Sequence, residues 1–210
     1  MFSLLLVKYF EFHEHWQQKG FFSACCRALY KEEEFVPVEK DLNSLPPLKP
    51  PKEELRLVEI NPDTFSSLQL EYSLRSRRKR AEYYFERGYR GLAMVHGEEV
   101  VGDVWYASCA YSLAPEIHPH VKWFGLNLCE NEIYMFDMHI DSPQRGGGLA
   151  TFFLNSCLHY LHGKGYQKAF GCFDPQNTPA LWVHRLMGYR EFPHFIVRRF
   201  FLYETGQPKG

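Results

Sequence analysis

The sequence predicts an α/β fold built on a mixed sheet, and three features of the chain lead to this prediction. β-rich and helical segments alternate from residue 55 to residue 203. Three consecutive glycines, Gly146 to Gly148, separate a predicted strand from a predicted helix. Hydrophobic residues make up 45% of the 210 residues and aromatic residues 17%, which is enough to bury the core of one ordinary domain with an extension.

The first 45 residues predict a small N-terminal α/β extension. It would contain an initial strand, a helix over residues 15–34 and a short strand over 34–42. Residues 46–54 predict a proline-rich linker, because proline at this density fixes an extended backbone. The main domain would then occupy residues 55–205.

The pattern of apolar residues predicts the elements of the main domain, since apolar runs favour strands and three- or four-residue spacing favours helices. Asn61 or Asp63 is the expected cap of the first helical segment, with Gly88 near its end. Gly163 ends the second helix, and Pro179 lies in the first turn of the last one. The predicted elements are a strand over 55–60, a helical segment over 61–88, a hairpin over 89–111 that turns at 96–98, an irregular segment over 112–130, a strand over 132–141, a helix over 147–163, a strand over 167–174, a helix over 177–188 and β structure over 190–204.

Targeting and charge features favour a cytoplasmic protein. The apolar run from Phe2 to Val7 is shorter than a signal-peptide core and has no basic flank, and no stretch approaches the ~20 apolar residues of a spanning helix. The six cysteines form no C-x-x-C pair, a pattern that suits free thiols in a reducing compartment. A net charge of -1 gives no overall attraction to nucleic acid or membrane, so we expect neither as a partner.

The glycine run predicts either a phosphate cradle or a flexible turn without a ligand. Helix N-termini present unpaired N–H groups and a positive dipole end, and a loop without side chains lets backbone amides converge on an anion. Two common phosphate motifs fit badly, because Leu149 follows where a P-loop needs lysine and Thr151 stands where the dinucleotide motif has its third glycine.

A third pattern fits well. Arg145, Gly148 and Ala150 match the signature R/Q-x-x-G-x-G/A. A second signature, N-x-x-A-x-x-L-Y-x-x-x-G-F/Y, is matched in register by Asn177, Ala180, Gly188 and Tyr189, with Val183 at the leucine place. The two signatures stand in the expected order, so the chain over residues 55–205 resembles the GCN5-related N-acetyltransferase (GNAT) superfamily, whose fold has a splayed central strand.

The resemblance implies acetyl-CoA as co-substrate, an amine as acceptor and no metal. The residues that it places against coenzyme A are Met138, His139 and Ile140 beside the pantetheine arm, Arg145, Gly146, Gly147, Gly148, Leu149 and Ala150 around the pyrophosphate, and Asn177 at the start of the helix over 177–188.

Catalytic residues are harder to assign. An amine with a pKa near ~10.4 must lose a proton before it attacks, and the leaving thiolate benefits from an acid. The resemblance places His184 where relatives carry a tyrosine acid, and Tyr134 and Phe136 where they often carry the base. Glu132 shares the face of Tyr134 by strand alternation and is a candidate that would act through a water. Asp137 and His139 are expected to face the other way, unless a bulge in this splayed strand upsets the alternation. The candidates are therefore His184, Glu132 and Tyr134, with the base left open.

Other groupings are weaker signals. The histidine pairs His118/His120, His13/His15 and His159/His162 lack the further ligands of a zinc site. The basic segment over residues 75–90 is most simply a solvated face, with attraction of an acidic acceptor as its functional alternative.

The sequence thus predicts an acyl-CoA-dependent N-acyltransferase that transfers directly to an amine, while a substituted enzyme on Cys157 or Cys172 stays open. The acceptor is open among amino sugars, small metabolites, polyamines and protein amines. The alternative is a catalytically impaired CoA-binding module with a sensing or interaction role. A homodimer is a further expectation, because the terminal strand FIVRRFFLY is apolar enough to pair across an interface.

Overall fold

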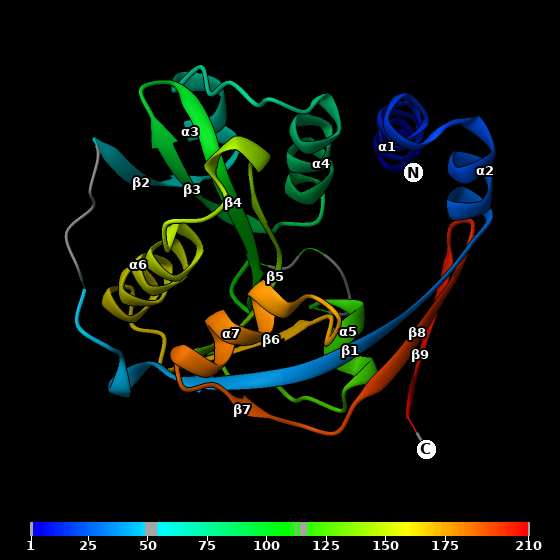
Figure 1. Cartoon of the computed structure of the whole chain (residues 1–210). Coiled ribbons are helices and arrows are strands. Elements are labelled where there is room, and N and C mark those ends of the chain that lie inside the picture. Colours follow the sequence, from blue (N-terminus) through cyan, green and yellow to red (C-terminus); the bar gives the residue numbers. More distant parts are fainter. Residues whose placement is uncertain (1, 49–53, 112, 114–116, 210) are drawn as a thin grey trace.

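A mixed sheet organises the chain in this computed structural model, which describes residues 2–48, 54–111, 113 and 117–209 (Figure 1). Within these residues the strand order is β2-β3-β4-β5-β6-β1-β8-β9, and β7 pairs with β1. Among the strands of the described residues, only β5 and β6 pair in parallel. The strands are β1 (Tyr30–Asp41), β2 (Leu55–Ile60), β3 (Arg90–His96), β4 (Glu99–Ala107), β5 (Glu132–Ile140), β6 (Lys168–Phe173), β7 (Arg190–Glu191), β8 (Phe195–Phe200) and β9 (Tyr203–Pro208).

Helices cover both faces of this sheet. They are α1 (Phe2–Lys19), α2 (Phe21–Leu29), α3 (Pro62–Ser67), α4 (Arg75–Phe85), α5 (Pro119–Trp123), α6 (Leu149–Gly163) and α7 (Thr178–Leu186). The fold class predicted from the sequence is confirmed, as are most element positions after residue 54.

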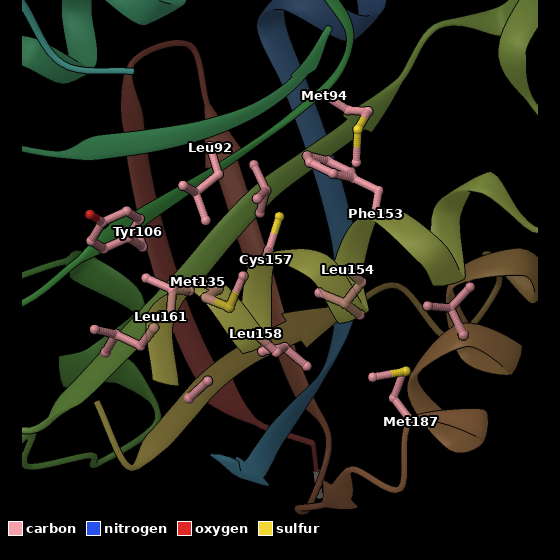
Figure 2. Packing of buried hydrophobic residues seen from close by; sticks show 14 of the residues in the cluster. Leu92, Met94, Tyr106, Met135, Phe153, Leu154, Cys157, Leu158, Leu161 and Met187 are labelled. Atoms are coloured by element: carbon pink, nitrogen blue, oxygen red, sulfur yellow. The ribbon is translucent and has the colours of Figure 1, made fainter. Parts of the chain in front are cut away.

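Helix α6 makes the core on one face, because its apolar residues recur at three- and four-residue spacing. Figure 2 shows Phe153, Cys157 and Leu161 of α6 directed at Leu92 and Met135 of the sheet. All three α6 side chains are fully buried. We call this the α6-side core. It fixes the start of α6, and therefore the glycine loop before it, relative to β5.

A second core lies on the opposite face, under α3, α4 and α5. Ala81 of α4 and Val121 of α5 pack there with Trp105, Tyr134 and Phe136 of the sheet. We call this the α4-side core. Because strand side chains alternate, β5 supplies Ile133 and Met135 to one core and Tyr134 and Phe136 to the other.

The N-terminal region differs from the prediction. Residues 2–19 form a helix, not a strand, and β1 is a long strand inside the sheet. One half of β1 pairs with β6, and the other half pairs with β8. The sequence predicts a separate small unit before the linker, whereas residues 30–41 share the sheet of the main domain. Residues 49–53 of the predicted linker lie outside the described residues.

Helix α1 is held in place by α4, which explains why it forms here. Both carboxylate oxygens of Glu14 accept hydrogen bonds from Ser76, one from its backbone N–H at 3.0 Å and one from its hydroxyl at 2.5 Å. Ser76 lies in the first turn of α4, so Glu14 satisfies one of the unpaired N–H groups at that helix start. Glu11 forms an ion pair with Arg80 one turn further on. These are contacts over more than 60 residues, which local patterns do not reveal.

One further segment departs from expectation. The helical segment predicted over 61–88 divides into α3 and α4, because the chain between them turns to bury Leu70 in the α4-side core. Asn61 caps α3, as predicted. The terminal stretch Phe195–Tyr203, which is expected to pair across a dimer, contains β8 and the first residue of β9. Within the chain, β8 pairs with β1 on one side and with β9 on the other, and the homodimer stays a prediction.

Among the described residues, no helix is long and apolar enough to cross a membrane. All six cysteines are free thiols.

Candidate active site

The central feature of the site is a fork between β5 and β6. The two strands pair only from Glu132 opposite Lys168 to Tyr134 opposite Phe170. Beyond that point β5 continues beside β4 as far as Ile140, while β6 pairs with β1. The edge of β5 that faces β6 therefore has no strand partner after Tyr134 among the described strands. Unpaired backbone of this kind is ready to hydrogen-bond a ligand.

A bulge changes the course of β5 just beyond the fork. Asp103 of β4 lies opposite His139, and Trp105 lies opposite Phe136, so β5 has one extra residue in this interval. Asp137 lies in this interval and has a φ of 51°, in the left-handed region. As a result Met138 and Ile140 turn to the α6-side core, while Phe136 stays in the α4-side core. The bulge thus interrupts the side-chain alternation, as the sequence analysis allowed.

Buried charges hold the bulge in its unusual conformation. The Asp137 carboxylate accepts hydrogen bonds from Arg77 at 2.9 Å, Arg80 at 2.8 and 2.9 Å, and the Tyr84 hydroxyl at 2.9 Å. Asp103 binds the other side of Arg77 at 2.6 Å. Burial alone would raise the pKa of Asp137, but the two guanidinium groups outweigh it and hold the pKa below its usual range.

These contacts correct one interpretation of the basic segment. Arg77 is only 6% exposed and Arg80 pairs with Asp137, so two of its arginines point into the molecule rather than to solvent. The outer residues Arg75 and Arg78 are exposed, as a solvated face requires.

The glycine loop has the geometry of an anion cradle. Gly146, Gly147 and Gly148 have φ angles of 108°, 56° and 82°, a region that side chains disfavour. A Cβ at any of the three would meet no atom of the described residues within 4 Å. Helix α6 begins at Leu149, whose N–H donates to the Gly146 carbonyl at 3.1 Å, and the next N–H groups of the first turn have no acceptor within the helix. The positive φ angles explain why glycine occupies these three positions, and the open space beside them has room for a ligand.

The flanking residues predicted to contact coenzyme A lie around the same loop. Arg145 donates from Nε to the Ile140 carbonyl at 3.0 Å, which ties the loop to the end of β5. His139 Nε2 lies 3.2 Å from an Asp141 carboxylate oxygen. Leu149 and Ala150 pack partly into the α6-side core. Asn177 caps α7, because its side-chain oxygen accepts from the Ala180 N–H at 3.2 Å. Their contacts with coenzyme A stay predictions.

His184 is packed into α7 rather than presented as a free acid. Its Nδ1 lies 2.7 Å from the Ala180 carbonyl, an atom that only accepts hydrogen bonds, so Nδ1 carries the proton. The ring stacks on Phe173 at 4.9 Å and meets Tyr189 edge-on at 4.8 Å. Burial lowers the pKa of His184, although the bond to Ala180 opposes that shift. An acid role would need the opposite shift.

Glu132 and Tyr134 lie in different environments on β5. Glu132 begins β5 at the closed end of the fork, where it accepts from the Cys129 N–H at 3.0 Å and lies 3.6 Å from the Lys168 ammonium. Tyr134 is fully buried two residues further on. Its hydroxyl lies 2.7 Å from His120 Nδ1 and donates to Cys172 Sγ at 3.3 Å.

His118 and His120 are functional candidates that the sequence suggested only as metal ligands. His118 caps α5, and its ring lies 4.4 Å from that of Phe136. Within the described ranges, no group of three or more His, Cys, Asp or Glu could hold a metal ion. The motif His118-Pro119-His120 was the available signal in the sequence. That its histidines approach β5 depends on tertiary packing, which the motif does not reveal.

The two cysteines weighed as nucleophiles are poorly activated. Burial raises the pKa of the Cys157 thiol well above its usual range and that of Cys172 to about 12. Since the thiolate is the nucleophile, these environments disfavour a covalent acyl-enzyme.

The fork beside β5 and the glycine loop before α6 are the two features that the resemblance noted in the sequence predicts. The family model "Acetyltransferase (GNAT) family" matches residues 55–189. This chain therefore belongs to the GNAT family. No curated protein matches it.

Solved structures show the same fold at low sequence identity. A GCN5-related N-acetyltransferase from Sphaerobacter thermophilus is 13% identical with a TM-score of 0.50, over 85% of this chain and 56% of that one. A tandem GNAT protein from the clavulanic acid biosynthesis pathway is 16% identical with a TM-score of 0.51, over 85% and 57%. The glucosamine N-acetyltransferase region of a fungal multi-domain β-N-acetylglucosaminidase is 14% identical with a TM-score of 0.53, over 90% and 22%. The chain thus spans little more than half of the first two structures.

Proposed function

We propose that the protein is an N-acyltransferase that uses acetyl-CoA and transfers the acetyl group directly to an amine. The observation that supports this most strongly is the union of an unpaired β5 edge with a glycine cradle at the start of α6. A linear co-substrate with a diphosphate at one end and amide groups along its arm suits both parts. The family membership is consistent with this chemistry.

The chain's own groups supply three parts of the reaction. Backbone N–H groups of Gly147, Gly148 and the first turn of α6 would bind the diphosphate. The unpaired edge of β5 would orient the pantetheine arm and offer an N–H group to the developing oxyanion. The hydrogen bonds that Arg80 and Tyr84 donate to Asp137 fix the bulge. They would thereby keep the backbone N–H groups of this β5 edge in position.

The function is tested by measuring acetyl-CoA binding by calorimetry and thiol release with a panel of amines. We expect binding together with release that depends on the amine. The panel should contain glucosamine, spermidine, 2-phenylethylamine and a lysine peptide, since the acceptor is not fixed by the fold. Binding without release for every amine would favour the alternative, a CoA-binding module that has lost catalysis. An absence of binding would contradict both.

The proposed acid role of His184 has its own test. His184→Phe keeps an aromatic ring against Phe173 but removes every ionisable group. If the ring mainly packs, turnover should stay within about threefold of wild type, whereas loss of a general acid costs about 100-fold or more. The matched control is His162→Phe on the exposed last turn of α6. A loss near 100-fold for His184→Phe alone, at unchanged acetyl-CoA affinity, would establish the acid role instead.

A further inference from the structure

Four polar side chains from three parts of the chain meet where β5 and β6 separate. His118 and His120 come from the start of α5, Tyr134 is the last residue of β5 that pairs with β6, and Cys172 lies on β6 beyond the fork. His120 Nδ1 is 2.7 Å from the Tyr134 hydroxyl and 3.7 Å from Cys172 Sγ. The cluster lies with the α4-side core, opposite α6 and its cradle. Tyr134 and Cys172 flank the point where the two strands separate, so the cluster borders the fork.

The hydrogen bonds distinguish the two histidines. The Tyr134 hydroxyl has one proton, which it donates to Cys172 Sγ at 3.3 Å, so it accepts from a protonated Nδ1 of His120. A neutral His120 then carries its lone pair on Nε2, and Nε2 has no hydrogen-bond partner among the described residues. His118 differs, because its own Nδ1 already accepts the backbone N–H of His120 at 3.2 Å.

The surroundings of His120 keep the ring neutral, although part of the side chain stays exposed. The rings of Phe35, Trp123 and Phe124 lie 5.7, 5.1 and 5.5 Å from it, and the side chain is only half-buried. Burial lowers its pKa to about 4. The titratable groups that face it are His118, Tyr134 and Cys172. More distant charges also influence the pKa values of this cluster. Arg87 and Asp137 act on the pKa of His118, and Glu33 acts on the pKa of Cys172.

We propose that Nε2 of His120 accepts the proton of the attacking amine and that Tyr134 is its positioning residue. This inference rests on the proposed acyl transfer. As the amine nitrogen bonds to the thioester carbonyl carbon, one N–H proton moves to Nε2. The C–S bond then breaks, and the imidazolium returns that proton to the thiolate directly or through water. The products are the amide and free thiol, and the ring ends neutral.

The position of Tyr134 strengthens the assignment. By the family resemblance, this strand place often carries the base, and here a phenol with a raised pKa occupies it. A phenol in this environment cannot take a proton at neutral pH. Its hydroxyl instead holds an imidazole, so the base is supplied by α5 in place of the strand.

The test compares His120→Gln, His120→Ala and Tyr134→Phe with wild type, using acetyl-CoA and the best amine of the panel. We expect His120→Gln to lower kcat at pH 7 by about 100-fold or more with unchanged affinity for acetyl-CoA. Added imidazole should restore part of the activity of His120→Ala. Tyr134→Phe removes one oxygen, and we expect a loss of about tenfold in kcat, little change in KM and a shifted acid limb of the pH profile. The control is His162→Gln on the exposed end of α6.

The outcomes separate this inference from the proposed function. Turnover of His120→Gln within twofold of wild type would overturn the inference alone, as would absence of imidazole rescue. An unchanged acid limb in Tyr134→Phe would overturn the positioning role. If wild type binds acetyl-CoA but releases no thiol with any amine, both the transferase function and the inference fail.

Discussion

Gly147→Val is expected to weaken acetyl-CoA binding at least tenfold, about 1.4 kcal/mol, in a protein that still folds. The valine side chain would enter space that no atom of the described residues occupies within 4 Å of its Cβ, where the diphosphate is expected to lie. A β-branched residue at a φ of 56° would also be strained by about 1–3 kcal/mol. Calorimetry with acetyl-CoA measures the affinity, and thermal unfolding measures the strain.

A matched control separates the two effects. Gly97 lies in the β3–β4 turn with a φ of 61° and equally open surroundings. Gly97→Val should lower the melting temperature about as much as Gly147→Val, by about 2–4 °C for each kcal/mol. Only Gly147→Val should weaken acetyl-CoA binding. Equal affinities in the two variants would mean that the glycine loop holds no diphosphate.

Asp137→Asn is expected to lower the free energy of unfolding by about 3 kcal/mol at pH 7. The change keeps the size of the side chain and tolerates the positive φ, but it leaves Arg77 and Arg80 without their shared carboxylate. Arg77 keeps its ion pair with Asp103. The expected loss in the free energy of unfolding therefore lies at the lower end of the range for breaking a buried ion pair. Urea unfolding measures the difference, and Asp63→Asn in the exposed first turn of α3 is the control, with an expected effect within about 0.5 kcal/mol.

The effect of Asp137 should depend on pH in a definite direction. Its pKa is lowered in the folded protein, so its contribution is complete above the unfolded value of about 3.9 and is lost as the pH falls toward the folded value. Between pH 7 and pH 3, the difference between wild type and Asp137→Asn should shrink by about 1 kcal/mol. A difference that stays constant over this range would show that the carboxylate is not held ionised by its two arginines.

The sequence predicts the conformation of the glycine loop well because the loop is local. Glycines that need positive φ, a strand before them and a helix after them are consecutive in the chain, so pattern and structure agree at Gly146 to Gly148. The same holds for the Asn61 cap and for the hairpin that turns at Gly97. In each case the physical requirement lies within a few residues.

Prediction was weaker wherever distant segments meet. The solvated-face reading of the basic segment was wrong for Arg77 and Arg80, because a bulge 57 to 60 residues away presents Asp137 to them. The N-terminal residues read as a strand, yet α4 stabilises them as a helix through Glu11 and Glu14. His120 gave only a weak metal signal, since its contact with Tyr134 spans two elements.

The sequence by itself determined the fold class, the order of most elements in the main domain and the family, because these follow from periodicity and from two motifs of consecutive or nearly consecutive residues. Only the tertiary structure decided where the sheet forks, which way the arginines of α4 point, that β1 closes the gap between β6 and β8, and which histidine approaches the fork. These features depend on hydrogen bonds and charges between segments far apart in the chain, and burial makes such contacts strong only once the whole core has formed.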